Sequence, residues 1–121
     1  MLSGYVKSSY LNIPAASKNA ELTLVELNEG TNFRLLGIQF TPTTAFGEFL
    51  FGVILRSSLG GDIFFQDEIF TGAGNGSASY AHNIASIPIP THGVFASKTS
   101  GVTVEGTGEG IAFVSITYQA G

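Results

Sequence analysis

The chain holds few side chains that could act as acids, bases or metal ligands. Its two histidines are His82 and His92, and its closest group of carboxylates is Asp62, Asp67 and Glu68. Protein zinc sites take three or four ligands from His, Cys, Asp and Glu. The histidines lie on separate predicted segments and would need one of these carboxylates, yet nothing in the spacing brings them together. We therefore predict no metal site and expect surface or hydrogen-bonded histidines.

The acidic group fits two further kinds of chemistry. Paired carboxylates that flank a sugar hydrolyse glycosidic bonds, and clustered carboxylates bind calcium. In an extended strand, Asp62 and Glu68 would share one face and Asp67 would point to the other. Because Asp67 and Glu68 fall late in a predicted strand, beside a loop, we interpret them as a solvated strand end. No catalytic residue is predicted.

Glycine-rich strings occur at residues 72–76 and 106–110. Neither has the spacing of a dinucleotide-binding loop, and neither opens a helix that could receive a phosphate. No G-x-S-x-G elbow is present, and the absence of cysteine excludes thiolate chemistry and disulfides. We predict no cofactor and no enzymatic activity. The second string is expected to be the turn of a hairpin between the last two strands.

The aromatic residues are the remaining candidates for a binding role. The chain has 10 Phe and 4 Tyr but no Trp. Five phenylalanines lie in strong strand patterns and are predicted to be core: Phe33, Phe49, Phe51, Phe65 and Phe113. Tyr5, Tyr10 and Tyr80 lie among polar residues, where they fit either interface anchors or platforms for stacking sugars.

Charged residues make up 12% of the chain, about half the usual share. The five Lys and Arg residues are scattered, which argues against a nucleic-acid face and a polybasic membrane anchor. No charged residue lies between Glu68 and Lys98, and none follows Glu109. Two readings fit: a compact domain with a Ser, Thr, Gly and Asn surface, or a domain whose surface is covered by partner subunits. No apolar signal segment is seen at the start, and the longest apolar run, 49–55, has strand length.

These residues are positioned by a predicted all-β fold. Sixteen glycines and four prolines interrupt the chain, and short alternating segments between them predict strands. The expected strands are residues 5–11, 21–27, 32–40, 48–56, 62–70, 80–88, 93–98, 101–105 and 110–119. Eight or nine strands at this spacing predict one domain, 1–121, with a two-sheet antiparallel β-sandwich of the jelly-roll type. An immunoglobulin-like topology would give a similar pattern.

Two strands carry specific packing predictions. In 32–40, simple alternation places Arg34, Leu36, Ile38 and Phe40 on one face and Phe33 and Leu35 on the other. The strand at 48–56 is apolar on both faces. It therefore needs cover from sheet packing on one side and from a second sheet or a neighbouring subunit on the other.

The pattern resembles small β-sandwich structural proteins of viruses, especially capsid and capsid-decorating proteins of bacteriophages. The segments that carry the resemblance are FRLLGIQFTPT from Phe33, EFLFGVILR from Glu48, and GVTVEGTGEGIAFVSITYQ from Gly101, which looks like the final hairpin of single jelly-roll subunits. The resemblance implies a non-enzymatic subunit that forms symmetric oligomers, often trimers, on or between capsomers.

The leading hypothesis is therefore a virion structural protein, of the minor capsid, decoration or cement kind, assembled in the host cytoplasm. Its expected partners are copies of itself, with a trimer favoured, and viral capsid or spike proteins. The expected interface is drawn from residues 69–97 and the last strand, with Ile87 and Val94 as test positions. The alternative is a carbohydrate- or receptor-binding module of a viral spike or fibre.

Overall fold

A computed structural model describes residues 5–17, 19–42, 49–71, 85–108 and 111–121. Apart from one short 3-10 turn, η1 (Ala15–Ser17), its regular elements are all strands. They are β1 (Lys7–Asn12), β2 (Glu21–Pro42), β3 (Phe49–Ser57), β4 (Ile63–Thr71), β5 (Ala85–Ile87), β6 (Val94–Gly108) and β7 (Ile111–Ala120). The all-β prediction is confirmed.

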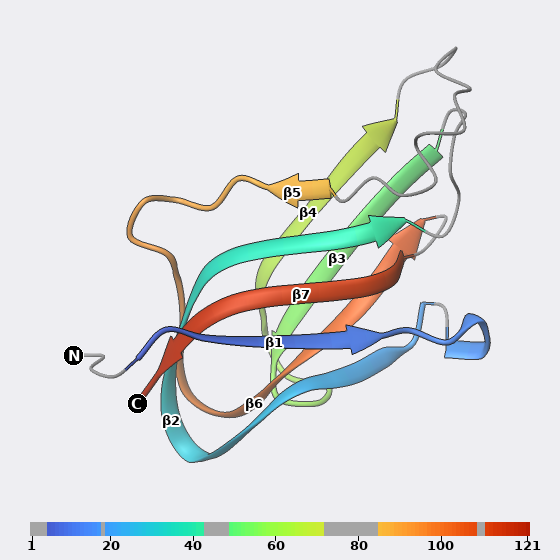
Figure 1. The fold of residues 1–121 in the computed structure, drawn as a ribbon. Coiled ribbons are helices and arrows are strands. Elements are labelled where there is room, and N and C mark those ends of the chain that lie inside the picture. The colour runs from blue at the N-terminus through green and yellow to red at the C-terminus, as the bar shows by residue number, and fades with distance from the viewer. Residues whose placement is uncertain (1–4, 18, 43–48, 72–84, 109–110) are drawn as a thin grey trace.

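The strands form one antiparallel, hydrogen-bonded sheet of seven strands. Their order is β1-β7-β2-β6-β3-β4, and β5 pairs with the end of β2 (Figure 1). The long strands β2 and β6 bend, so that β3, β4 and β6 pass behind β1 and β7 at an angle. The sheet therefore curls over its own apolar side.

The described chain has fewer strands than the nine predicted segments. The segments 21–27 and 32–40 are one strand, β2, and the segments 93–98 and 101–105 are one strand, β6. Gly30 (φ 84°) and Lys98 (φ 52°) occupy the left-handed region at the two bends. The Lys98 amide donates to the Asn32 side-chain oxygen at 3.2 Å, which ties the bends together. Glycine and polar residues thus turn the strands here without ending them.

Three predicted segments extend beyond the described residues. Of the strand at 80–88, the structure describes residues 85–88, of which 85–87 form β5. Residues 80–84 of that strand, residue 48 of the predicted strand 48–56 and residue 110 of the predicted strand 110–119 lie outside the described ranges.

The predicted final hairpin is wrong. β6 pairs with β2 and β3, whereas β7 pairs with β1 and β2. In the sheet order, β2 lies between them. The glycine string therefore connects two non-adjacent strands. The physical reason is that glycine accepts many backbone conformations, so a Gly-rich sequence is compatible both with a strand that folds back beside its predecessor and with one that crosses to another part of the sheet.

The predicted alternation in 32–40 is also wrong. Phe33, Leu35, Ile38 and Phe40 are all buried, so the buried side switches between Leu35 and Ile38. The register against β7 shifts at this point: Leu35 faces Tyr118 and Gly37 faces Thr117. Leu36 is the extra residue of a β-bulge. Because a bulge puts two residues opposite one, it reverses which side chains face inward.

The core fills the space inside the curl. Phe33 is fully buried and stacks on Tyr118 of β7, with ring centroids 5.2 Å apart. The Phe33 ring also contacts the ring of Phe64 on β4 in an edge-on arrangement, with the two centroids 5.7 Å apart. Since β2 and β4 are separated by β6 and β3 in the sheet, this contact joins two distant parts of the same apolar surface.

The apolar strand β3 is covered without another chain where the structure describes its side chains. Phe51, Val53 and Leu55 face the core, with at most 1% of each exposed. On the other face Ile54 is 8% exposed and lies between Gln66 of β4 and Glu105 of β6. The long stems of such polar side chains can cover a neighbouring apolar one. At Ile54, therefore, this face of β3 is covered without the second sheet or neighbouring subunit that the sequence predicted.

Candidate functional site

The residues predicted as alternatives for metal or acid–base chemistry do not converge. His92 is exposed in the link between β5 and β6, and His82 lies outside the described residues. Asp67 and Glu68 lie on β4, and Asp62 precedes it. Within the described ranges, no group of three His, Asp or Glu side chains is placed to hold a metal ion.

The acidic residues of β4 lie on an edge strand. Among the strands that the structure describes, β4 pairs with β3 alone. Glu68 lies opposite Gly52, and Asp67 lies opposite Val53, whose side chain faces the core. The Asp67 carboxylate accepts a hydrogen bond from the Glu68 amide at 2.7 Å. Charges along a free edge, including those on its inward side, disfavour pairing with another strand.

A second set of carboxylates ties strands together. Glu21, at the start of β2, accepts hydrogen bonds from the Thr103 hydroxyl at 2.5 Å and from the Gly60 amide at 2.8 Å. The Thr103 bond, the Gly60 bond and the nearby Arg56 charge lower the pKa of Glu21 below its ordinary value, against the opposing effect of desolvation. Arg56 itself pairs with Glu105 across β3 and β6. These contacts hold β2, β3, β6 and the β3–β4 turn together.

The outward side chains of β1, β7, the second half of β2, and β5 form a different kind of surface. Strand register aligns them in rows, because directly opposed residues share a face. One row is Tyr10, Ser115, Gln39 and Ser86, taken across β1, β7, β2 and β5. We call this the hydroxyl row. Neighbouring rows are Ser8, Thr117 and Gly37 on one side, and Asn12, Phe113 and Thr41 on the other.

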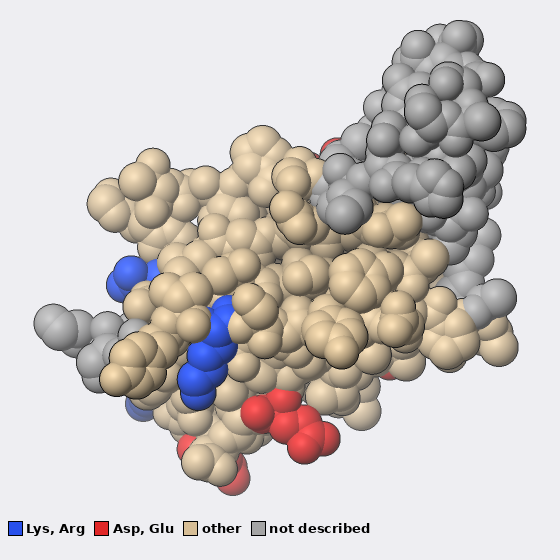
Figure 2. Space-filling model, in the orientation of Figure 1, with Lys and Arg blue, Asp and Glu red and all other residues tan. Residues whose placement is uncertain are grey.

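These ten residues together are the neutral face, since none carries a charge. Figure 2 shows the described part of this side of the molecule mostly in tan, with most of the visible Lys, Arg, Asp and Glu atoms toward the left and lower parts. At its margin, Arg34 lies opposite Phe95 and Gln119. The Arg34 guanidinium carbon lies 4.6 Å from the Phe95 ring centroid, a cation–π distance. Phe95 is 50% exposed.

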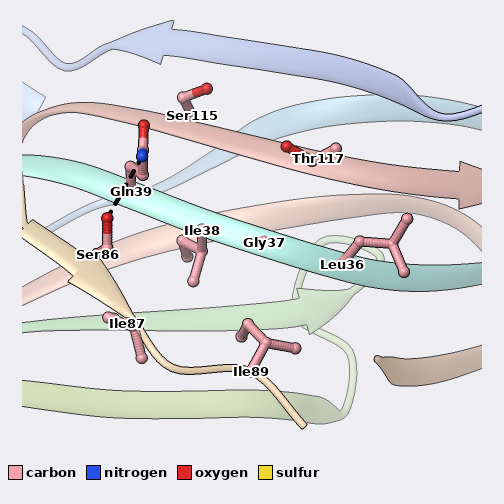
Figure 3. A pocket seen from close by; sticks show the side chains of 9 residues that line it. All are labelled: Leu36, Gly37, Ile38, Gln39, Ser86, Ile87, Ile89, Ser115 and Thr117. Atoms are coloured by element: carbon pink, nitrogen blue, oxygen red, sulfur yellow. Dashed lines mark hydrogen bonds between the residues drawn. The ribbon is translucent and has the colours of Figure 1, made fainter. Parts of the chain in front are cut away.

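A shallow pocket of about 280 Å³ opens on the neutral face. Gly37, Gln39, Ser86, Ser115 and Thr117 supply its polar lining, and Leu36, Ile38, Ile87 and Ile89 its apolar lining (Figure 3). The Gln39 amide nitrogen donates to the Ser86 hydroxyl at 3.3 Å, joining β2 to β5. A Cβ atom added at Gly37 would lie 3.7 Å from the Thr117 hydroxyl oxygen. The absence of a side chain there keeps the floor between the strands open.

The tyrosines predicted to bind are placed differently from one another. Tyr10 is 67% exposed and stacks on Phe113, with centroids 5.8 Å apart and planes 29° apart. Phe113, predicted as core, is therefore part of an outward aromatic pair, and it is half-buried. Tyr5 is 87% exposed, before β1 begins. Tyr80 lies outside the described ranges.

Sequence reasoning missed Gln39, Ser86, Ser115 and Thr117 as neighbours. Each is an ordinary polar residue on the outward side of its strand, and they are far apart along the chain. Alternation in 110–119 marks Ser115 and Thr117 as facing one side, but the bulge at Leu36 decides that Gln39 joins them. Only strand pairing aligns the row.

Comparison with known proteins finds no matching family model, and no curated protein or solved structure matches the chain. Among the described residues, no helix is both long and apolar enough to cross a membrane.

Proposed function

We propose that the protein is a non-enzymatic structural subunit that assembles with copies of itself through the neutral face and its Phe95 margin. The observation that carries the proposal is the division of charge between the two sides of the sheet. The side formed by β3, β4 and β6 carries Arg56, Glu68 and Glu105, whereas the neutral face carries none. Uncharged, partly apolar surface is the kind that subunit interfaces bury.

The bent sheet supports a finer proposal about the fold, namely a two-sheet sandwich of the jelly-roll type. Dividing β2 at its bend gives one set of strands, β1, β7, residues 33–42 and β5, and a second set, residues 21–26, β6, β3 and β4. This division makes eight strands in two fours, which is the jelly-roll number. An experimental structure with these two sets in layers about 10 Å apart would support it.

The setting we propose is a virus particle, in which the protein is a capsid, decoration or cement subunit. Jelly rolls build many viral capsid domains, and the β-rich pattern of the sequence resembles such subunits. In this setting the partners are further copies, in a trimer, and viral capsid or spike proteins. Assembly takes place in the host cytoplasm, and the final location is the virion.

The test compares oligomeric mass between the wild type and charge variants. Phe95→Asp puts a carboxylate on the exposed margin and is expected to give a monomer with an unchanged β-sheet circular dichroism spectrum. Leu59→Asp is the matched control, because Leu59 is 71% exposed in the β3–β4 turn, away from the neutral face. It should keep the wild-type mass. Ile87 is unsuitable for this test because it is 4% exposed and belongs to the core.

Light scattering at micromolar concentration gives the answer. A wild-type protein that is monomeric there would overturn the proposal. So would a Phe95→Asp variant that keeps its oligomeric mass while Leu59→Asp loses it, because assembly would then use the opposite side of the sheet.

A further inference from the structure

We propose that the hydroxyl row, with the pocket beside it, is a binding site for a neutral oligosaccharide. This inference goes beyond assembly. Because the row belongs to the neutral face, a glycan and a second copy of the chain compete for it. The inference rests on the types of side chain in the row, their alignment across the sheet, and the aromatic pair at one end.

The donors and acceptors of the row match those of a sugar. Ser and Thr hydroxyls and the Gln amide each donate and accept hydrogen bonds, as sugar hydroxyls do. All four residues Gln39, Ser86, Ser115 and Thr117 line the pocket, with Ser115 and Thr117 half-buried and Gln39 and Ser86 exposed. Figure 3 shows Gln39 and Ser86 directed toward one another from adjacent strands. Such a set can exchange hydrogen bonds with several hydroxyls at once.

The charge of the site selects a neutral ligand. No Lys, Arg, Asp or Glu lines the pocket. A phosphate, sulfate or carboxylate group is normally held by Arg or Lys through charge-assisted hydrogen bonds. Burying such an anion against uncompensated polar groups is unfavourable. A sugar without acidic groups meets no such penalty.

The length of the row fits an extended ligand. Adjacent strands lie about 4.8 Å apart, so the distance from Tyr10 on β1 to Ser86 on β5 is roughly 14 Å. This is long enough for a short oligosaccharide lying across the strands. The pocket volume, about 280 Å³, is near the lower end of small-molecule sites, which suits one sugar ring seated there and others on the open sheet.

Tyr10 supplies an apolar platform at the end of the row. Its ring is largely exposed yet braced by its stacking on Phe113. A rigid, amphipathic ring offers contact area with little loss of conformational freedom. The C–H side of a sugar ring can pack on it while the sugar hydroxyls reach Ser115, its direct neighbour on β7.

The experiment screens the full chain on an array of neutral and acidic glycans, then titrates the best neutral glycan by calorimetry, expressed per protein chain. Gln39→Leu removes the amide at an exposed position, and Tyr10→Ala removes the platform. Each should weaken binding about tenfold or more, since each loses one to two polar or stacking contacts. Tyr5→Ala is the matched control, as Tyr5 is exposed but outside the row; it should bind like the wild type.

The outcomes separate this proposal from assembly. Phe95→Asp should bind the glycan at least as tightly per chain as the wild type, because loss of the oligomer leaves the row uncovered and Phe95 itself aligns with Arg34, five residues along β2 from Gln39. Absence of any neutral glycan among the hits would overturn the site, as would a preference for sulfated or sialylated glycans. Binding unchanged in both Gln39→Leu and Tyr10→Ala would overturn it as well.

Discussion

At the scale of single residues, glycines decide how closely two strands can approach. At Gly101 of β6, an added Cβ would lie 2.7 Å from the backbone oxygen of Val25, closer than van der Waals contact allows. At Gly37, the nearest atoms would be 3.7 and 3.8 Å away, in ordinary contact. The two positions are thus expected to respond differently to the same methyl group.

Gly101→Ala should lower the free energy of unfolding by about 1–3 kcal/mol, because the β2 backbone must move to admit the methyl group. Gly37→Ala should change it by about 1 kcal/mol or less, with reduced freedom of the unfolded chain acting in its favour. Urea denaturation of both variants measures the difference. Equal effects would contradict the close approach at Gly101.

Glu21 gives a residue-scale prediction about pH. Its folded-state pKa lies below the ordinary value, through the Thr103 and Gly60 hydrogen bonds and the Arg56 charge. A lowered carboxyl pKa adds stability above the unfolded-state pKa, and this contribution is lost as the pH falls through the folded-state pKa. The loss should therefore occur in the acidic range below about pH 4.5.

The measurement compares the wild type with Glu21→Gln at pH 7 and pH 3 by urea unfolding. The variant should be less stable at pH 7, and the gap should narrow at pH 3. Glu29→Gln, which removes an exposed charge from the same strand, controls for the change in net charge. A gap of the same size at both pH values would show that the ionised carboxylate is not the stabilising form.

At the scale of elements, the bulge in β2 determines which side chains reach the core. Leu35 is fully buried, whereas Leu36 is half-buried at the pocket on the neutral face. Without the bulge, Leu36 would share a face with Ile38 and Phe40. The two adjacent leucines therefore report directly on the register of this strand.

Leu35→Ala should lower the free energy of unfolding by about 2–5 kcal/mol, as expected for a large-to-small change in a packed core. Leu36→Ala should lower it by about 1 kcal/mol or less, because less of its surface is removed from water. Denaturant titrations with equal m-values allow the comparison. If Leu36→Ala were the more destabilising of the two variants, β2 would have the uninterrupted alternation predicted from the sequence, with no bulge at Leu36.

At the scale of the whole molecule, the ten residues of the neutral face are uncharged while the chain carries a net charge of -4. Added salt does not weaken contacts between uncharged surfaces, but it does screen the repulsion between copies that carry the same net charge. The oligomer should therefore keep its mass, or gain stability, between about 0.05 and 1 M salt. Analytical ultracentrifugation over this range tests it. Dissociation at high salt would point to an ionic interface instead.

The sequence by itself determined the class of the fold and much of its local pattern. Glycine and proline spacing, with alternating apolar residues, located β1, β3, β4 and β7 to within a few residues. It also left residues 57–61 between two expected strands, and the structure has the β3–β4 turn there, where Ser58 and Gly60 have positive φ and the Gly61 amide donates to the Ser58 carbonyl at 3.0 Å. These features depend on neighbours along the chain, so a local pattern carries them.

Only the tertiary structure decided which strands pair and where the outward rows fall. The bulge at Leu36, the bends at Gly30 and Lys98, and the crossing from β6 to β7 depend on contacts between residues far apart in sequence. A one-residue shift reverses every later side chain of a strand, and no local signal marks it. The hydroxyl row exists because four strands align, and alignment is a property of the folded sheet.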